Sequence, residues 1–303
     1  MTYQPKVYRD MGGDRQVFAP GGTLLMQPGS FIQWANPTGA ADYFVDGNVS
    51  ATGDGTLQSP YSTIAEAIAA SDISIALTAN RWWARRNRIF VMGDTLTEDL
   101  VKFPTKCDVI GLGSYDANDK PGIYGHHAPV GESYGTRFFN VHFKAKAHAS
   151  PIITLTNETA GLKIIGCTLD GTLGTMTSGI LATASPFLEV IDCDFIGTFA
   201  TSYITFGTGE AGRARIMKNR MLGTAAKGIV AGSGMTASWI PLIDGNIIRA
   251  TGQWIDDDSA LFMVTNNKGI TDIDCATYTA GFDFNLLLAS GNLQTGSNAG
   301  DHD

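Results

Sequence analysis

A run of carboxylates beside a tryptophan is the first group of side chains that could do chemistry. Asp256, Asp257 and Asp258 follow Trp254 after a single residue. Carboxylate oxygens are ligands for Ca²⁺, so the run could contact a cation or, with the indole, a sugar. Consecutive strand residues face opposite sides, however, and an exposed turn tolerates three acids. We expect an exposed acidic turn, with a cation or sugar contact as the alternative.

Asp192 and Asp194 form a second carboxylate pair. They flank Cys193, so on a strand both would point away from the core while the cysteine points inward. Polysaccharide hydrolysis uses two such carboxylates. The repeat described below places Lys218 and Arg220 beside them, so we predict cross-strand ion pairs here rather than catalysis.

Two further groups are a histidine pair and a basic aromatic patch. His126 and His127 are adjacent and diverge on an extended chain, and no second ligand pair has metal spacing, so no metal site is expected. Residues 82–86 read Trp-Trp-Ala-Arg-Arg and could dock a partner or sugar, or pack over neighbouring structure. The chain has no Ser/His/Asp or Cys/His arrangement and no phosphate loop. We therefore expect no catalytic residue and no cofactor.

The composition limits the classes of partner. Only 17% of the 303 residues are charged, 44% are hydrophobic, 36 are glycine, and the net charge is −8. The apolar fraction argues against disorder, and an acidic, charge-poor chain is a poor phosphate binder, so no nucleic-acid partner is expected. Neither a signal peptide nor a membrane span is visible. The four cysteines lack CxxC spacing and are expected to be free and buried; they are Cys107, Cys167, Cys193 and Cys275.

A repeat of 26 residues indicates the elements that position these side chains. Four copies align without gaps: GLKIIGCTLDGT (161–172), FLEVIDCDFIGT (187–198), RARIMKNRMLGT (213–224) and WIPLIDGNIIRA (239–250). Apolar residues alternate with period 2, the strand signature. The alternation slips once per copy, which marks a corner between two strands, at the pairs Ile164-Ile165, Val190-Ile191, Ile216-Met217 and Leu242-Ile243. The predicted inward columns are Leu162, Leu188, Ala214, Ile240; Ile164, Val190, Ile216, Leu242; Cys167, Cys193, Asn219, Gly245; and Leu169, Phe195, Met221, Ile247.

Further features of the repeat support this register. The segment 138–143 extends the columns to an earlier copy, and a third apolar patch recurs with drifting spacing at 180–183, 203–206, 228–231 and 254–256. Outward charges alternate in sign from copy to copy, as neighbouring strands favour. The expected charge columns are Lys163, Glu189, Arg215; Asp192, Lys218, Asp244; and Asp194, Arg220.

These observations predict an all-β fold, a right-handed single-stranded parallel β-helix with about 26 residues per rung. A β-sandwich is the alternative, but its hairpins do not keep a gapless period. Ser62 or Thr63 can cap a short helix that buries Ile64, Ala67, Ile68 and Ser71 and plugs the first rung. We expect an N-terminal arm (1–40), an entry strand and capping helix (41–85), the β-helix (86–283) and a C-terminal tail (284–303).

The stretches YFVDGN, GDGTLQSPYSTIAEAI, RIFVMGDTLTEDL and CDVIGLGS carry a resemblance to a known superfamily. Over roughly residues 43–280 the chain resembles the pectin-lyase-like β-helix proteins. That superfamily includes polysaccharide lyases and hydrolases, phage tailspikes and non-enzymatic virion proteins, so the resemblance implies the fold more strongly than an activity.

The N-terminal arm carries a second resemblance. Its glycine pairs and short apolar strands look like the opening segment of small phage virion proteins, of the form YR-x-x-GG-(D/N)-x-x-V-x-x-x-GG-x-L. A plain strand pairing with the first rung is the other interpretation. The matching residues are Tyr8, Arg9, Gly12, Gly13, Asp14, Val17, Gly21, Gly22 and Leu24.

The resemblances imply a structural protein of a tailed-phage virion. We expect a non-enzymatic capsid decoration or cement protein, located on the phage head, whose arm docks on the major capsid protein and which forms a homotrimer. The alternative is a tail fibre or tailspike protein that binds or cleaves host surface polysaccharide; a free polysaccharide lyase is a third possibility. No metal and no membrane partner is expected.

Overall fold

A computed structural model of the protein describes residues 40–76, 85–93, 96–113, 120–130, 134–146, 149–156, 161–183, 187–209, 213–232, 235, 240–257 and 262–269, together with the backbone of 7–9, 16–18, 273–274 and 293–294. The chain separates into two compact units, Met1–Ala35 and Asn36–Asp303.

The first unit contains a β-hairpin. Strand β1 (Val7–Arg9) pairs antiparallel with β2 (Gln16–Phe18), and Tyr8 lies opposite Val17. Strand β1 therefore pairs with its neighbour in sequence. The glycines of the predicted motif at 12, 13, 21 and 22, with Asp14 and Leu24, lie outside the described residues.

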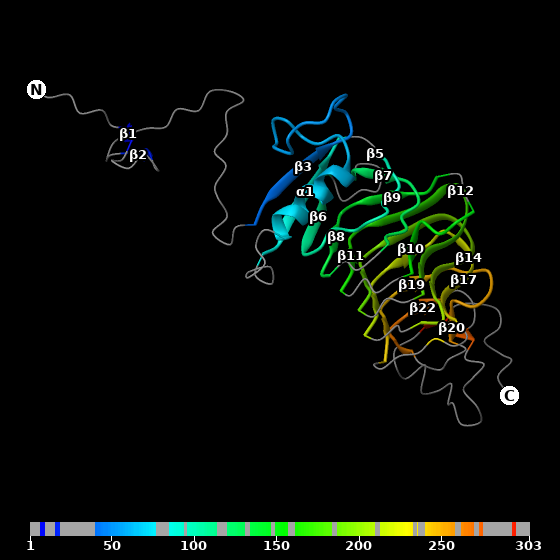
Figure 1. Ribbon diagram of the computed structural model, residues 1–303. Coiled ribbons are helices and arrows are strands. Elements are labelled where there is room, and N and C mark those ends of the chain that lie inside the picture. Colours follow the sequence, from blue (N-terminus) through cyan, green and yellow to red (C-terminus); the bar gives the residue numbers. More distant parts are fainter. Residues whose placement is uncertain are drawn as a thin grey trace, which may run out of the picture. The chain divides into compact units, whose positions relative to one another are not determined.

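The second unit is a parallel β-solenoid of about five turns at roughly 26 residues per turn, as the sequence predicted (Figure 1). Its described strands form two stacked parallel sheets. The nine-stranded sheet contains β3 (Asp42–Asp46), β4 (Asn87–Met92), β6 (Cys107–Gly111), β8 (Arg137–Phe139), β11 (Lys163–Ile165), β13 (Glu189–Ile191), β15 (Arg215–Met217), β18 (Leu242–Asp244) and β21 (Met263–Thr265).

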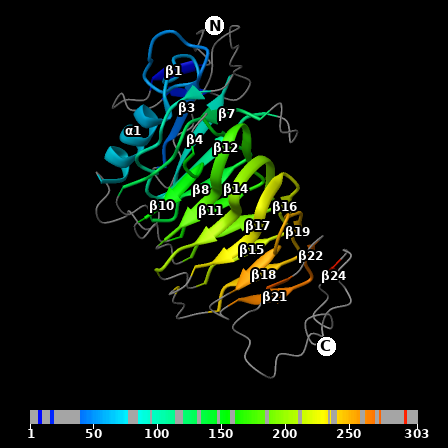
Figure 2. The same ribbon diagram turned by 90° about the vertical axis from the view of Figure 1, so that its right-hand side faces the viewer.

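The other sheet has thirteen described strands and includes both remaining sides of each turn. Two of its strands, β12 (Thr168–Ala182) and β14 (Asp194–Phe206), are long and bend, and Figure 2 shows them as curved ribbons. In these two turns the second and third strands that the repeat predicts are therefore one continuous strand. Its members are β5 (Leu96–Thr97), β7 (Gly122–Tyr124), β9 (His142–Lys144), β10 (Ile153–Leu155), β12 (Thr168–Ala182), β14 (Asp194–Phe206), β16 (Arg220–Met221), β17 (Thr224–Ala231), β19 (Ile247–Ile248), β20 (Ile255–Asp257), β22 (Lys268–Gly269), β23 (Ile273–Asp274) and β24 (Leu293–Gln294).

The core lies between the sheets and follows the predicted columns through the first three aligned copies. Ile164, Val190 and Ile216 stack in register and are fully buried. The third apolar patch also stacks, with Ile180, Ile204, Ile229 and Ile255 opposite one another. The core is therefore a set of like side chains repeated from turn to turn, which stabilises each turn through its neighbours.

The gapless alignment is wrong by one residue in the fourth copy. Ile216 pairs with Ile243, not Leu242, so the step between these turns is one residue longer. Ile243 and Ile248 are buried, whereas Ile240 is 66% and Ile247 is 43% exposed. Asp244 consequently lies opposite Met217 and leaves the predicted charge column. The adjacent apolar residues Leu242 and Ile243 hid the shift, because either fits a period-2 pattern.

A column of residues with positive φ forms the corner that causes the slip in alternation. Each follows the strand of the nine-stranded sheet and turns the chain toward the other sheet. Asparagine, aspartate and glycine suit this left-handed conformation, and most of the column is of these types. Its members are Asn140, Gly166, Asp192, Lys218, Gly245 and Asn266, with φ between 53° and 68°.

The residue after each corner points into the core, and in three successive turns it is asparagine. Asn219, Asn246 and Asn267 are fully buried. The Asn219 Nδ2 donates to Asn246 Oδ1 at 2.9 Å, and the Asn246 Nδ2 donates to Asn267 Oδ1 at 2.8 Å. Each amide also donates to a backbone carbonyl of the preceding turn, from Val190, Ile216 and Ile243 respectively. The inward ladder expected at Asn219 is confirmed, with Asn246 rather than Gly245 as the next member.

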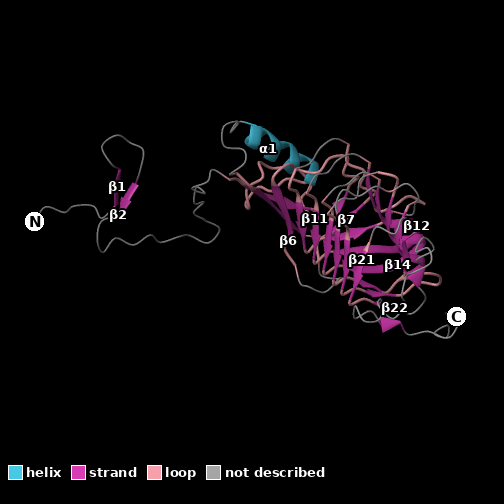
Figure 3. Cartoon of the chain, turned by 90° about the horizontal axis from the view of Figure 1, so that it is seen from below, coloured by secondary structure: helices cyan, strands magenta, loops and turns pink. Residues whose placement is uncertain are grey.

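The predicted capping helix is α1 (Ile64–Ala76), which buries Ile64, Ala67, Ile68 and Ser71 as expected, together with Ile75. Figure 3 shows it at one end of the stacked strands. Thr63 is the N-cap: its hydroxyl accepts from the Glu66 amide, while the Glu66 carboxylate accepts from the Thr63 amide. The Glu98 carboxylate accepts from the Ile64 and Ala65 amides, although burial raises its pKa. In the part of the chain that the structure describes, no helix is long and apolar enough to cross a membrane.

Candidate functional site

A row of charged side chains runs along the outer face of the nine-stranded sheet. One outward position of each strand is charged from β3 to β15, and we call this set the charge row. Its members are Asp42, Arg88, Asp108, Arg137, Lys163, Glu189 and Arg215, each opposite the next. The predicted column of Lys163, Glu189 and Arg215 is thus the second half of a longer row.

Most of the charge row is paired within the chain. Arg88 donates to both oxygens of Asp42 at 2.7 and 2.6 Å, and Lys163 Nζ lies 2.9 Å from both carboxylate oxygens of Glu189. Outside the row, Arg220 lies 3.5 Å from Asp194, as the repeat predicted. Partly exposed pairs of this kind stabilise modestly, by about 0.2–1 kcal/mol each.

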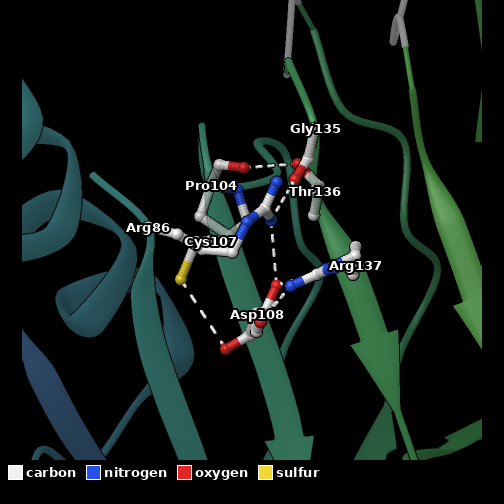
Figure 4. Close-up of polar contacts among 7 residues, drawn as sticks. All are labelled: Arg86, Pro104, Cys107, Asp108, Gly135, Thr136 and Arg137. Carbon is white, nitrogen blue, oxygen red and sulfur yellow. Dashed lines mark hydrogen bonds and ion pairs between the residues drawn. The ribbon is translucent and has the colours of Figure 1, made fainter. Parts of the chain in front are cut away.

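Asp108 is the most enclosed member of the row and receives two guanidinium groups (Figure 4). Arg137 donates to both of its oxygens at 2.6 Å, and Arg86 donates to Oδ1 at 2.9 Å and to the Gly135 carbonyl at 2.7 Å. The Thr136 hydroxyl donates to the Pro104 carbonyl beside them. Both oxygens of Asp108 are engaged by arginines, so the cluster joins neighbouring turns rather than offering a free carboxylate to a substrate.

A second polar cluster, missed by the sequence analysis, lies on the other sheet. His142 Nε2 lies 3.0 Å from Asp170 Oδ2, and the Thr172 amide donates to Asp170 Oδ1 at 2.8 Å. Burial would raise the pKa of Asp170, but these hydrogen bonds outweigh it and hold the pKa below its ordinary value. The two residues are 28 positions apart in sequence, which is one turn of 26 residues plus two. A search for polar residues separated by one turn plus two positions would have found this pair.

Lys120 lies beside the same part of the sheet. Its ammonium is buried and donates to the Gly166 carbonyl at 2.9 Å and to the Thr168 hydroxyl at 3.1 Å. His142 and Asp170 have side-chain exposures of only 3% and 9%. Lys120 and the His142–Asp170 pair thus lie along the same part of the sheet, but Lys120 binds Gly166 and Thr168, while His142 and Asp170 bind each other. This geometry stabilises the stack and leaves little surface for a substrate.

The acidic run after Trp254 does not form the exposed turn that we expected. Trp254 is fully buried, and Asp256 and Asp257 lie in β20 with exposures of 2% and 1%. Asp256 forms an ion pair with Lys227, and Asp257 Oδ2 accepts from the Phe262 amide at 2.9 Å. A buried indole offers no face for a sugar to stack on. Asp258 lies outside the described residues, and no cluster of metal-ligand residues occurs among those described.

The histidine pair diverges, as expected. His126 Nδ1 contacts the Pro151 carbonyl, while His127 is fully buried against the edge of Phe143. The Leu100 amide donates to His127 Nδ1 at 3.2 Å, so this nitrogen is unprotonated. Burial lowers the pKa of His127 to about 3. Of residues 82–86, the tryptophans lie outside the described residues, while Arg85 binds the Ser74 carbonyl at 2.8 Å and Arg86 binds Asp108.

This buried histidine predicts a pH-dependent stability. The unfolded state takes up a proton near pH 6.5, whereas the folded state does so only near pH 3. Folding stability therefore falls as the pH drops below 6.5, by about 2 kcal/mol between pH 6 and pH 4.5. We expect His127→Asn, whose amide oxygen can replace Nδ1 as acceptor, to flatten this part of the profile. Urea unfolding at a series of pH values measures it; equal slopes for both proteins would contradict the assignment.

Three cysteines are free and buried, as predicted, and Cys275 lies outside the described residues. Cys167 and Cys193 occupy the inward column of adjacent turns, and the Val141 amide donates to Cys167 Sγ at 3.5 Å. Burial raises the pKa of Cys193 well above its ordinary value and that of Cys107 to about 12. Cys107 and Cys193 therefore remain thiols and act as core side chains.

A groove of about 320 Å³ lies between α1 and the segment 99–102. Ile68, Ile73 and Val101 contribute apolar surface, and Asp72 pairs with Lys102 at its rim. Asp99, also at the groove, binds the His126 amide and Lys146. The groove thus holds no carboxylate pair poised for acid and base catalysis.

Each sheet therefore brings carboxylates and basic groups together, and the described partners of these groups are one another and nearby backbone atoms. Comparisons with protein families, with curated proteins and with solved structures found no match.

Proposed function

We propose that this chain is a structural component of a tailed-phage virion, a capsid decoration protein that attaches through its N-terminal arm and stabilises the head. The observation that carries the proposal is the division of the chain. A small unit with its own hairpin precedes a β-solenoid that folds around a separate core. An arm of this kind can bind the major capsid protein while the solenoid contributes a rigid body, and repeated copies multiply a modest contact.

The carboxylates of the polar clusters are occupied by neighbouring groups, which supports a structural rather than an enzymatic role. The Asp108 and Asp170 carboxylates are bound by arginine, histidine and backbone groups. The aromatic and acidic residues suggested for a sugar, Trp254 and Asp256, are buried. These features favour decoration of the head over the tailspike alternative, which needs accessible acids and aromatic rings for host polysaccharide.

Binding of the purified full-length chain to undecorated capsids tests the proposal. The double substitution Tyr8→Ala with Arg9→Glu changes one aromatic and one arginine in β1. We expect it to weaken co-sedimentation with capsids by at least about 10-fold, a loss of roughly 1.4 kcal/mol. Phe187→Ala with Arg213→Glu is the matched control, because these residues form an aromatic and arginine pair on the solenoid surface.

The control is expected to bind capsids as the wild-type chain does. Cryo-electron microscopy of purified virions then locates the protein. Density on the head at junctions of capsid subunits is the expected result. Density at the tail tip, or cleavage of host polysaccharide by the purified chain, would replace the decoration proposal with the tailspike alternative.

A further inference from the structure

An unbroken row of apolar side chains lies beside the charge row on the outer face of the nine-stranded sheet. One outward position per strand is aromatic or aliphatic from β3 to β15, and we call this set the apolar row. Each member lies opposite the next and is partly exposed. Its members are Phe44, Phe90, Ile110, Phe139, Ile165, Ile191 and Met217.

The apolar row is not explained by the core. Its residues alternate along each strand with the buried set that includes Val109, Phe138 and Ile164, so they point away from the interior. Phe44 and Phe90 stack with ring centroids 5.1 Å apart, and Arg88 lies over the Phe90 ring and Arg137 over the Phe139 ring, so the two rows pack side by side on this face. Seven strands at about 4.8 Å give a row ~30 Å long. Contiguous exposed apolar surface of this kind marks an interaction site.

We propose that the apolar row is a self-association surface, on which the solenoid of one chain packs against the same face of a second copy. The proposal does not depend on the role in a virion. It rests on the period of the row, on the pairing of the charges beside it and on the area available.

The period of the row favours a second copy. Its side chains repeat from turn to turn at the strand spacing of about 4.8 Å. An α-helix presents rows with a pitch of about 5.4 Å, which drifts out of step over this length. Another solenoid presents the same row with the same period, so that the side chains of the two copies can interdigitate along its whole length. Such a contact is self-complementary, as symmetric dimers require.

The chemistry of the row and its flank also fits a protein surface. The seven side chains carry no N–H or O–H group, so they cannot satisfy the hydroxyls of a sugar. On the flank, Asp42 is paired with Arg88, Asp108 with Arg137 and Lys163 with Glu189. A second copy can therefore cover this flank without burying an unpaired charge at those positions, which would be costly.

The area suffices for a weak association. The outward face runs from the positive-φ residues before each strand to the corner column, five residue steps or about 17 Å, which gives ~500 Å² per copy over a length of ~30 Å. The residues at its first edge are Gly135, Gly161, Phe187 and Arg213. This area is just below the range for specific interfaces, about 600–1,000 Å² per partner. The contact therefore predicts a weak, reversible oligomer rather than an inseparable one.

Sedimentation equilibrium of the full-length chain tests the proposal. We expect the wild-type chain to associate, and Ile165→Lys with Ile191→Lys to raise the dissociation constant at least about 100-fold, since each buried ammonium opposes assembly. Ile196→Lys with Leu222→Lys is the matched control. These two residues are also partly exposed and lie on adjacent turns away from the apolar row, Ile196 in β14 of the other sheet and Leu222 directly after β16. The control is expected to associate as the wild-type chain does.

Ile165→Thr with Ile191→Thr provides a second, milder variant, because threonine keeps the β-branched shape and the strand preference. Circular dichroism and cooperative thermal unfolding check that each variant is folded, and a folded Thr variant decides the result if the Lys variant does not fold. A wild-type chain that stays monomeric at ~100 μM would overturn the proposal. So would unchanged association of the folded row variants, or equal dissociation of the control.

Discussion

Replacing Asn246 with leucine is expected to lower the free energy of unfolding by about 3–5 kcal/mol, because leucine removes the central amide of the buried asparagine ladder. The Asn246 side chain donates to Ile216 O and Asn267 Oδ1 and accepts from the Asn219 amide and side chain, all within 3.0 Å. Leucine has a similar size but leaves these buried groups without that partner. Burying polar groups without hydrogen bonds outweighs the gain in apolar surface.

Urea unfolding followed by circular dichroism measures this change. Asn48→Leu is the control, since Asn48 is exposed near the start of the solenoid and its replacement should stay within about 0.5 kcal/mol. If Asn246→Leu lowers the free energy of unfolding no more than Asn48→Leu does, the hydrogen bonds of the ladder do not contribute to stability.

Gly197→Ala is expected to destabilise the protein by at least about 3 kcal/mol or to prevent folding, since two separate penalties apply. Gly197 has a φ of +88°, which disfavours a side chain. An added Cβ would also lie only 2.3 Å from the Gly171 carbonyl carbon and the Thr172 nitrogen. These are backbone atoms of the neighbouring turn, so relief requires the two turns to separate.

Gly161→Ala separates the two penalties. Gly161 has a φ of +81°, but an added Cβ would come no closer than 3.5 Å to the Gly135 backbone. We expect a cost of about 1–2 kcal/mol from the left-handed conformation alone. Thermal and urea unfolding of both variants give the difference. If Gly197→Ala costs no more than Gly161→Ala, the close approach between turns is not what requires glycine at 197.

The sequence predicts the structure well where a residue type has only one favourable position. Lys163 and Glu189 identified adjacent strands because opposite charges are favoured across a pair, and the helix at Ile64 follows from its cap and its buried face. The alignment of the fourth copy was wrong by one residue because Leu242 and Ile243 are both apolar, so either could be placed opposite Ile216. A better signal was present: Gly245 suits the left-handed corner, as Gly166 does, and the following Asn246 continues the inward column from Asn219.

The candidate sites were harder to predict because they depend on contacts that a repeat period does not contain. Asp256 reads as a surface acid, yet Lys227 from the previous turn allows it to be buried. The pairing of His142 with Asp170 is diagonal between turns, so a search for residues in the same column overlooks it. Part of the apolar row, Ile165, Ile191 and Met217, is present in the aligned repeats, where these residues mark the corner of each copy. The rest of the row lies in the earlier strands, which do not align with the repeat in sequence.

The in-register stacking of turns makes length an adjustable property of this protein. Adding one turn of roughly 26 residues would add one rung to the core and one side chain each to the charge row and the apolar row, with the existing contacts preserved. The proposed self-association surface and the stability of the body would then grow together in equal steps. Duplication or loss of a repeat is therefore a route by which evolution or design can tune the strength of assembly without altering the chemistry of the contact.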